Sequence, residues 1–129
     1  MLINCSNHPY TIWPDAQREA AKIYGAVKDL PFPPIGPEQQ MPQLRELAEA
    51  YAEKIEGEHP AAVMVAGEFT FTFLLVDKLL CDGVRVLCPC SKRVTTEVRR
   101  PDGTNEKNAI FIFECFREYQ HYCTTNGKR

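Results

Sequence analysis

Residues 61–70 read AAVMVAGEFT, an unbroken apolar run over 61–66 followed at once by the turn-like Gly67-Glu68-Phe69-Thr70. A strand covered on one face alternates apolar and polar residues, whereas a strand covered on both faces is apolar throughout. The run therefore predicts a central strand of a parallel sheet. A helix is predicted over 71–80, so this stretch reads as strand, turn and helix.

Upstream of this stretch the pattern alternates strand and helix. Short apolar runs at 2–5 and 26–30 predict two further strands. The segments 14–25 and 42–57 each open on proline and close on glycine, as helices often do. The second of these helices carries an apolar stripe expected to face the core: Leu44, Leu47, Ala48, Tyr51 and Ile55.

Downstream, a fourth parallel strand is predicted over 84–88, and the rhythm then changes. Two extended segments, 93–100 and 108–116, are joined through Pro101-Asp102-Gly103 and predict a hairpin at one edge of the sheet. The polar tail, 120–129, is expected to be disordered.

The whole pattern predicts an α/β fold. Alternating strands and helices favour a mostly parallel sheet with right-handed crossovers and helices on both faces. We therefore expect one Rossmann-like sandwich over residues 1–119, ending in a C-terminal β-hairpin. The 129 residues suit a single domain.

Composition narrows the classes of partner. The formal net charge is -2, whereas a protein that binds long nucleic acids usually has a large basic excess. No apolar run approaches the roughly 20 residues that span a bilayer, and the N-terminus does not resemble a signal peptide. We therefore expect a cytoplasmic protein that binds neither membranes nor long nucleic acids.

Six cysteines need an interpretation in so short a chain. They lie mainly in apolar segments and lack the paired C-x-x-C spacing of zinc ribbons, so buried free thiols are favoured over disulfides. A metal site formed by Cys88, Cys90 and a histidine is the less favoured alternative. No metal or cofactor is expected.

Ligands of doubly wound sheets bind outside the carboxyl ends of the strands. The residues expected at that edge are mostly polar or aromatic: Ser6, Asn7 and His8 after the first strand, Asp29 and Phe32 after the second, Glu68, Phe69 and Thr70 after the third, and Cys90, Ser91, Lys92 and Arg93 after the fourth. Lys92, Arg93 and the free N–H groups of the helix starting near Thr70 suit a phosphate. Phe32 or Phe69 could stack on a base.

Each of these residues also has a structural interpretation. Ser6 and Asn7 could serve simply to cap or turn the chain, His8 could lie on a surface loop, and Thr70 could cap a helix. Glu68 favours function, because a carboxylate directly after an apolar strand is expected to be partly buried and to need a partner. No Gly-rich dinucleotide fingerprint or Walker loop is present, which argues against nicotinamide cofactors and nucleoside triphosphates.

Four signatures occur in order along residues 1–119: Ser6-Asn7-His8-Pro9, Gly67-Glu68-Phe69-Thr70, Ser91-Lys92-Arg93-Val94 followed by Glu97, and Phe116-Arg117-Glu118-Tyr119. Together they resemble the small standalone CRISPR-associated CARF-like proteins of type III systems, a group that includes ring nucleases. The Cys88-Pro89-Cys90 stretch departs from that group and has no role in the resemblance.

The resemblance implies a homodimer that binds a cyclic oligoadenylate, most simply cyclic tetra-adenylate. It implies metal-independent cleavage, in which a ribose 2′-hydroxyl attacks the neighbouring phosphate and type III signalling is switched off. Roles then follow for the candidate residues: Lys92 and Arg93 stabilise phosphate charge, Ser6, Asn7 and Ser91 position phosphate and ribose, His8 or Glu68 is the general base, and Phe32, Phe69, Thr70 and Arg117 contact the ligand.

Two other functions compete with the ring nuclease. A sponge or sensor module would bind the same messenger through the same contacts without cutting it. A nucleotide- or sugar-phosphate-binding domain would use the same strand ends for an unrelated ligand. The sequence alone leaves all three open.

Overall fold

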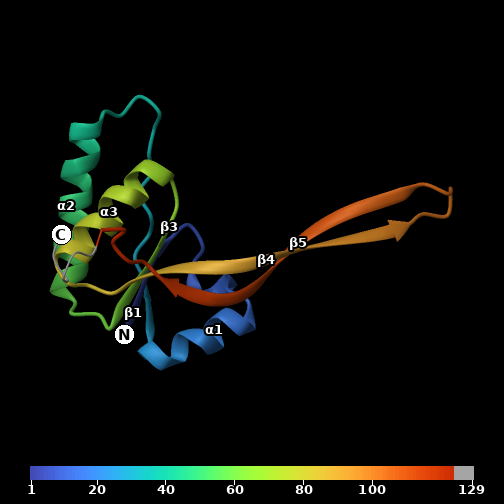
Figure 1. Cartoon of the computed structure of the whole chain (residues 1–129), viewed down its shortest axis with the longest axis horizontal. Coiled ribbons are helices and arrows are strands. Elements are labelled where there is room, and N and C mark those ends of the chain that lie inside the picture. The colour runs from blue at the N-terminus through green and yellow to red at the C-terminus, as the bar shows by residue number, and fades with distance from the viewer. Residues whose placement is uncertain (124–129) are drawn as a thin grey trace.

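A computed structural model describes residues 1–123 as one five-stranded sheet with helices on both faces (Figure 1). The strand order is β2-β1-β3-β4-β5, with parallel pairing throughout except between β4 and β5. The expected α/β Rossmann-like architecture and C-terminal hairpin are confirmed. The elements are β1 (Leu2–Ser6), α1 (Asp15–Ala21), β2 (Val27–Asp29), α2 (Met41–Gly57), β3 (Ala62–Ala66), α3 (Phe69–Cys81), β4 (Val86–Arg99) and β5 (Asn105–Glu118), with short 3-10 turns at Tyr10–Ile12 and Lys22–Tyr24.

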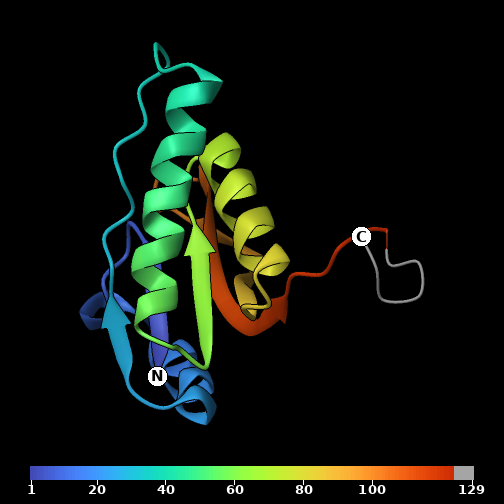
Figure 2. The same ribbon diagram turned by 90° about the vertical axis from the view of Figure 1, so that its left-hand side faces the viewer.

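The sheet separates two hydrophobic clusters. Alternate residues of β3 point to opposite faces, so Val63 and Val65 pack with α2 and α3, while Met64 packs with Trp13 near α1. Figure 2 shows α2 and α3 together on one side of the sheet. Residues Ala62–Val65 are fully or almost fully buried, which explains why β3 lacks alternation in the sequence.

The helix α2 begins one residue before the expected position. Gln40 and Gln43 form a reciprocal capping box, in which the backbone N–H of Gln40 donates to Oε1 of Gln43 over 2.8 Å. Proline lies in the first turn, where its missing N–H has no helical partner to lose. The expected stripe is buried at Leu44, Ala48 and Ile55.

The prediction of a fourth strand ending at residue 88 is wrong. After Val86 and Leu87, which pair with β3, β4 continues to Arg99 as one long strand paired with β5. A register shift between Cys90 and Ser91 marks the point where the hairpin leaves the sheet. We call residues 91–113 the arm, which projects from the body (Figure 1).

The segment after β5 has no regular secondary structure over residues 119–123. The backbone N–H of Tyr119 still donates to the carbonyl of Val86 over 2.8 Å, which anchors the start of this segment to the body. The rest of the expected disordered tail, 124–129, lies outside the described residues. Within residues 1–123, no helix combines the length and apolarity needed to cross a lipid bilayer.

Candidate functional site

A cavity of about 270 Å³ lies between the root of the arm and the α1 side of the body. It is found at the carboxyl ends of β1 and β3, the edge at which the fold predicts a ligand. Its lining comes from five parts of the chain: Ser6 and His8; Ile12, Trp13, Pro14 and Gln17; Met64 and Ala66; Pro89 and Ser91; and Phe111 and Phe113.

The loop that carries His8 is held by hydrogen bonds to the backbone of His8. The His8 carbonyl accepts hydrogen bonds from Nδ2 of Asn4 at 2.8 Å and from Nε1 of Trp13 at 2.9 Å, and the backbone N–H of His8 donates to Oγ of Ser6 at 3.2 Å. All three partner residues are buried. Because three separate hydrogen bonds hold the backbone of this one residue, the loop is fixed while the His8 side chain stays exposed.

A carboxylate at the end of β2 extends this network. Asp29 accepts from Nδ2 of Asn4 at 2.8 Å and from the backbone N–H of Tyr10 at 3.1 Å. Ser6 donates to Oδ1 of Asn4 at 2.7 Å, so the amide of Asn4, 1% exposed, has partners at both ends. The strand ends of β1 and β2 and the His8 loop therefore form one rigid unit.

The walls of the cavity are mainly apolar and aromatic. Trp13 and Phe113 are almost fully buried, and Phe113 stacks edge-on against Phe116 at 5.0 Å between ring centroids. Polar groups are few: the buried Gln17 amide, the Ser6 and Ser91 hydroxyls, and the His8 imidazole. An apolar pocket with a few convergent polar groups suits a flat heteroaromatic ligand such as a nucleobase.

The arm brings some of the expected phosphate ligands to this cavity. Ser91 lines it, and the β4–β5 register pairs Ser91 with Phe113 and Arg93 with Phe111. Successive residues of a strand point to opposite faces, so Arg93 lies on the same face of the arm as Ser91. Lys92 lies on the opposite face.

The turn before α3 was expected in the same pocket, yet neither Glu68 nor Thr70 is among the residues that line it. Glu68 is exposed, contrary to the expected partial burial, and caps α3. Its Oε1 accepts from the backbone N–H of Phe71 at 2.7 Å, and its Oε2 accepts from the Thr70 hydroxyl at 2.7 Å. The Phe71 N–H and then the Thr70 hydroxyl lower the pKa of Glu68.

The remaining candidate ligand residues are dispersed. Phe32 is buried and packs edge-on against Phe71, with 5.4 Å between centroids, so it belongs to the core. Phe69 is 88% exposed and lies in a separate groove along α3. Asn7 is exposed and does not line the cavity. Arg117 pairs with Cys88, on the α2 and α3 face of the sheet.

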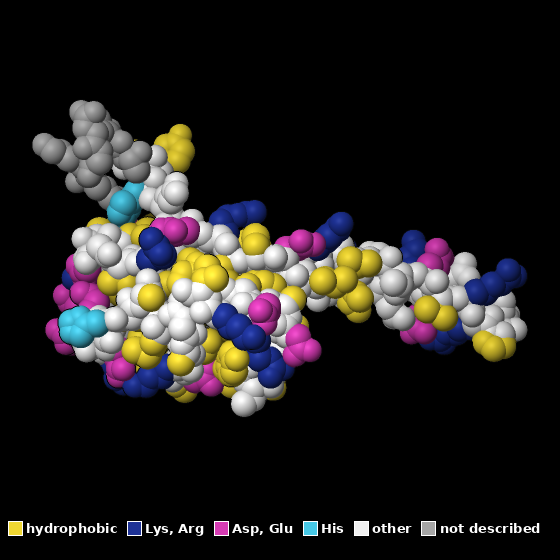
Figure 3. Space-filling view, turned by 90° about the horizontal axis from the view of Figure 1, so that it is seen from below, with side chains coloured by type: hydrophobic (Ala, Val, Ile, Leu, Met, Phe, Trp, Pro, Cys, Tyr) yellow, Lys and Arg dark blue, Asp and Glu magenta, His cyan; other side chains and the backbone are white. Residues whose placement is uncertain are grey.

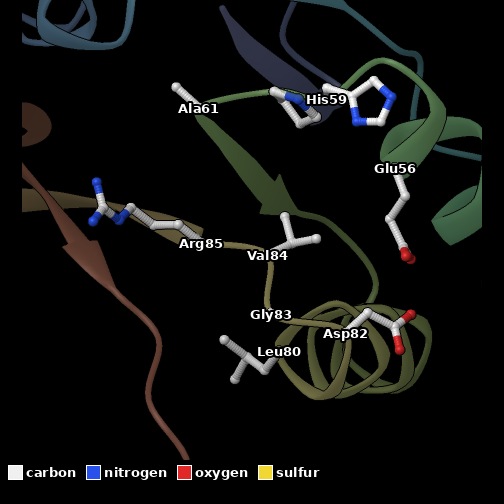
Figure 4. A pocket seen from close by; sticks show the side chains of 9 residues that line it. Glu56, His59, Ala61, Leu80, Asp82, Gly83, Val84 and Arg85 are labelled. Carbon is white, nitrogen blue, oxygen red and sulfur yellow. The ribbon is translucent and has the colours of Figure 1, made fainter.

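A larger depression, about 800 Å³, lies at the amino ends of β3 and β4 (Figure 4). Glu56 and Asp82 reach it from the ends of α2 and α3, and their carboxyl groups point toward one another. Partial burial and then the hydrogen bond with Asp82 raise the pKa of Glu56. Since ligands of this fold bind at the opposite edge, we assign the site to the smaller cavity.

The six cysteines, all within residues 1–123, are thiols rather than disulfides, as expected, but only Cys5 is buried. Burial raises the pKa of the Cys5 thiol to about 12, so it stays protonated near neutral pH. Cys88 and Cys90 are half-buried, and Cys90 lies directly opposite the exposed Cys115 on β5. The alternative metal site at Cys88 and Cys90 finds no support, because the described residues contain no cluster of three His, Cys, Asp or Glu side chains that could hold a metal.

Several residues that shape the site were missed by the sequence interpretation, notably Asn4, Trp13 and Gln17. One signal was present: an asparagine inside the apolar run Leu2–Cys5 must find buried partners. Its partner Asp29 is distant in sequence, so only the folded chain identifies it. Phe111 and Phe113 were assigned to an edge hairpin, and nothing in their spacing places them over α1.

A family model described as "Uncharacterized protein MJ1673 family" matches residues 1–117. The match extends from the N-terminus almost to the end of β5, so it includes both the cavity and the arm. Searches of curated proteins and of solved structures found no match.

Proposed function

The chain belongs to the MJ1673 family, and on the chemistry of its cavity we propose that it binds a cyclic oligoadenylate and cleaves the ring. The observation that carries the proposal is the position of His8 and Ser91, which flank an aromatic cavity at the carboxyl ends of β1 and β3. Cyclic tetra-adenylate is the preferred ligand, following the resemblance to the CARF-like ring nucleases of type III CRISPR systems.

The cavity is smaller than a whole messenger ring. Small-molecule sites usually measure about 300–1,000 Å³, and this cavity measures about 270 Å³. It would therefore take one base and part of its ribose, with Trp13, Phe111 and Phe113 surrounding the base. Arg93, on the arm face that carries Ser91, would then contact a phosphate outside the cavity.

The proposed reaction needs a base and groups that stabilise phosphate charge. His8 takes the proton of a ribose 2′-hydroxyl, and the 2′-oxygen attacks the adjacent phosphorus. The bond from phosphorus to the 5′-oxygen breaks, and the leaving oxygen takes a proton from water. The product is a linear adenylate with a 2′,3′-cyclic phosphate end. Ser91 and Arg93 donate to the phosphate oxygens as charge develops.

His8 is a better candidate for the base than Glu68. The Glu68 carboxylate is held by the Phe71 N–H and the Thr70 hydroxyl, both of which favour its charged form and weaken it as a base. It also belongs to the α3 side of the sheet. The imidazole of His8, in contrast, lines the cavity.

The proposal includes a homodimer working in the cytoplasm.

The second candidate function, a sponge that binds without cutting, is favoured by one feature of the site. Of the described residues that line the cavity, none is lysine or arginine, so positive charge would have to come from a neighbour such as Arg93 on the arm.

Incubation with cyclic tetra-adenylate in the presence of EDTA separates the candidates. Linear adenylates with 2′,3′-cyclic phosphate ends, resolved by chromatography and mass spectrometry, support the ring nuclease. Tight binding by calorimetry with an intact ring after long incubation at high protein concentration leaves the sponge. Absence of binding contradicts both.

A further inference from the structure

The arm is a two-stranded ribbon that stands clear of the sheet, with apolar side chains in solvent. Ile110, Ile112 and Val98 are 50%, 47% and 49% exposed. By strand alternation these three share one face with Val94, opposite the face that covers the cavity. We call Val94, Val98, Ile110 and Ile112 the aliphatic face of the arm.

Such a ribbon has little support of its own. An isolated two-stranded hairpin is at best marginally stable in water, and long apolar hairpin edges in solvent invite association. Hydrophobic side chains are visible along the projecting part of the molecule in Figure 3. The aliphatic face is therefore expected to be covered when the protein is at work.

The same chain has a second exposed apolar surface. A groove of about 480 Å³ runs along α3 and is lined by Phe69, Phe73, Val76, Leu80, Tyr119 and Tyr122, among others. Phe69 is 88% exposed and Phe73 is 67% exposed, although both are large hydrophobic residues on one helix. Neither Phe69 nor Phe73 belongs to the described core clusters.

We infer that two copies of the chain exchange arms, the aliphatic face of each arm covering the α3 groove of the other copy. A two-fold axis makes such a contact twice, because the arm of one copy meets the groove of its partner and the reverse. The charges are also complementary, since the positive Lys92 lies on the aliphatic side of the arm and the negative Asp77 lines the groove.

The expected areas favour exchange over a simpler pairing of the two arms. Ser91 to Arg99 are paired in register with β5, so the arm is roughly 25–30 Å long and about 10 Å wide, and one face presents on the order of 300 Å². Two arm faces stacked together would bury on the order of 600 Å², below the roughly 1,200 Å² of stable interfaces. Two arm-to-groove contacts bury on the order of 1,200 Å².

This inference identifies the surface of the proposed homodimer and is independent of the ligand. The aliphatic face is opposite the cavity face of the arm, so the cavity remains accessible. Failure to bind an adenylate would leave the dimer untouched, and a monomeric protein could still bind one. The two proposals therefore fail in distinguishable ways.

The test is the mass of the full chain in solution by light scattering, at micromolar concentration under reducing conditions. We expect twice the 14.7 kDa of the chain. Ile110→Lys on the arm and Phe73→Lys in the groove should each shift the mass to that of the monomer. Thr95→Lys, on the cavity face of the same arm, is the matched control and should stay dimeric. Circular dichroism checks that each variant is folded.

Mixing the two defective variants adds a second test. A heterodimer of Ile110→Lys with Phe73→Lys keeps one intact arm-to-groove contact, whereas either variant alone keeps none. Dimer that forms on mixing, at protein concentrations at which neither variant dimerises alone, supports exchange. A monomeric wild-type protein would overturn it, and a dimer insensitive to Phe73→Lys would overturn it in favour of arms stacked on each other.

Discussion

The indole Nε1 of Trp13 donates a hydrogen bond to the backbone carbonyl of His8 over 2.9 Å. This bond ties the start of α1 to the loop that follows β1 and fixes one wall of the cavity. Trp13 is 2% exposed and contacts Tyr10 and Phe116 through its ring, so the same residue supports both the hydrophobic cluster on this face and the proposed catalytic loop.

Replacing Trp13 with phenylalanine tests this coupling. The substitution keeps an aromatic ring but removes the N–H donor and leaves a small void, so the free energy of unfolding should fall by about 1–3 kcal/mol. Denaturation followed by circular dichroism measures the loss. Cyclic tetra-adenylate should also bind more weakly, because the His8 loop loses one of its three restraints. Unchanged stability would show that the bond contributes nothing.

Replacing His8 with alanine tests the general base. The side chain is exposed and its loop is held by backbone and neighbouring donors, so the fold and the affinity for cyclic tetra-adenylate should be retained. The cleavage rate should fall by about 10²–10⁴-fold. Single-turnover assays at saturating protein separate rate from affinity. A rate equal to wild type would assign the base elsewhere.

Glu68→Gln should affect stability with a characteristic pH dependence. The pKa of Glu68 in the folded state is lowered, first by the Phe71 N–H and then by the Thr70 hydroxyl. Its stabilising effect is therefore fully present above the pKa of the unfolded state and is lost as pH falls through the folded pKa. The melting temperatures of wild type and Glu68→Gln should differ at pH 7 and converge in acid.

Cleavage by Glu68→Gln should match that of wild type. A rate lost at pH 7 in a folded Glu68→Gln protein would return this carboxylate to the proposed reaction. A difference in melting temperature that grows in acid would contradict the capping role.

Much of the fold could be predicted because burial imposes a pattern on the sequence. The doubly covered β3 is apolar throughout, and α1 and α2 carry proline near their starts and glycine near their ends. The length of β4 could not be predicted for the same reason: from Ser91 to Arg99 the strand is mostly exposed on both faces, so no burial constrains its sequence. Ser91-Lys92-Arg93 therefore has the composition of a loop.

The site was predicted in part. Ser6, His8 and Ser91, all expected at strand ends, line one cavity, although Ser91 reaches it from within the long strand β4. The strand-end rule cannot show which face of the sheet each residue reaches, and Glu68 lies with α3 on the other face. It also overlooks buried residues such as Asn4, which reach the site through backbone contacts rather than through position at a strand end.

A disulfide provides a check on the register of β4 and β5 just before the arm. Cys90 and Cys115 are directly opposed on antiparallel strands, where Cα atoms lie about 4.5–5.5 Å apart, within the range of a disulfide. Mild oxidation by diamide, which takes up both thiol hydrogens, should link these two residues first. Peptide mapping by mass spectrometry identifies the pair, and Cys115→Ser removes it. A dominant Cys88–Cys115 link would contradict the register.

The most direct test of the ligand site is the affinity for cyclic tetra-adenylate, measured by calorimetry, of two tryptophan variants on one face of the arm. Ser91→Trp places a large ring in the mouth of the cavity, while Thr95→Trp places the same ring further along the same face. We expect Ser91→Trp to abolish binding and Thr95→Trp to bind as wild type does. Wild-type affinity in Ser91→Trp would contradict the assignment of this cavity as the ligand site.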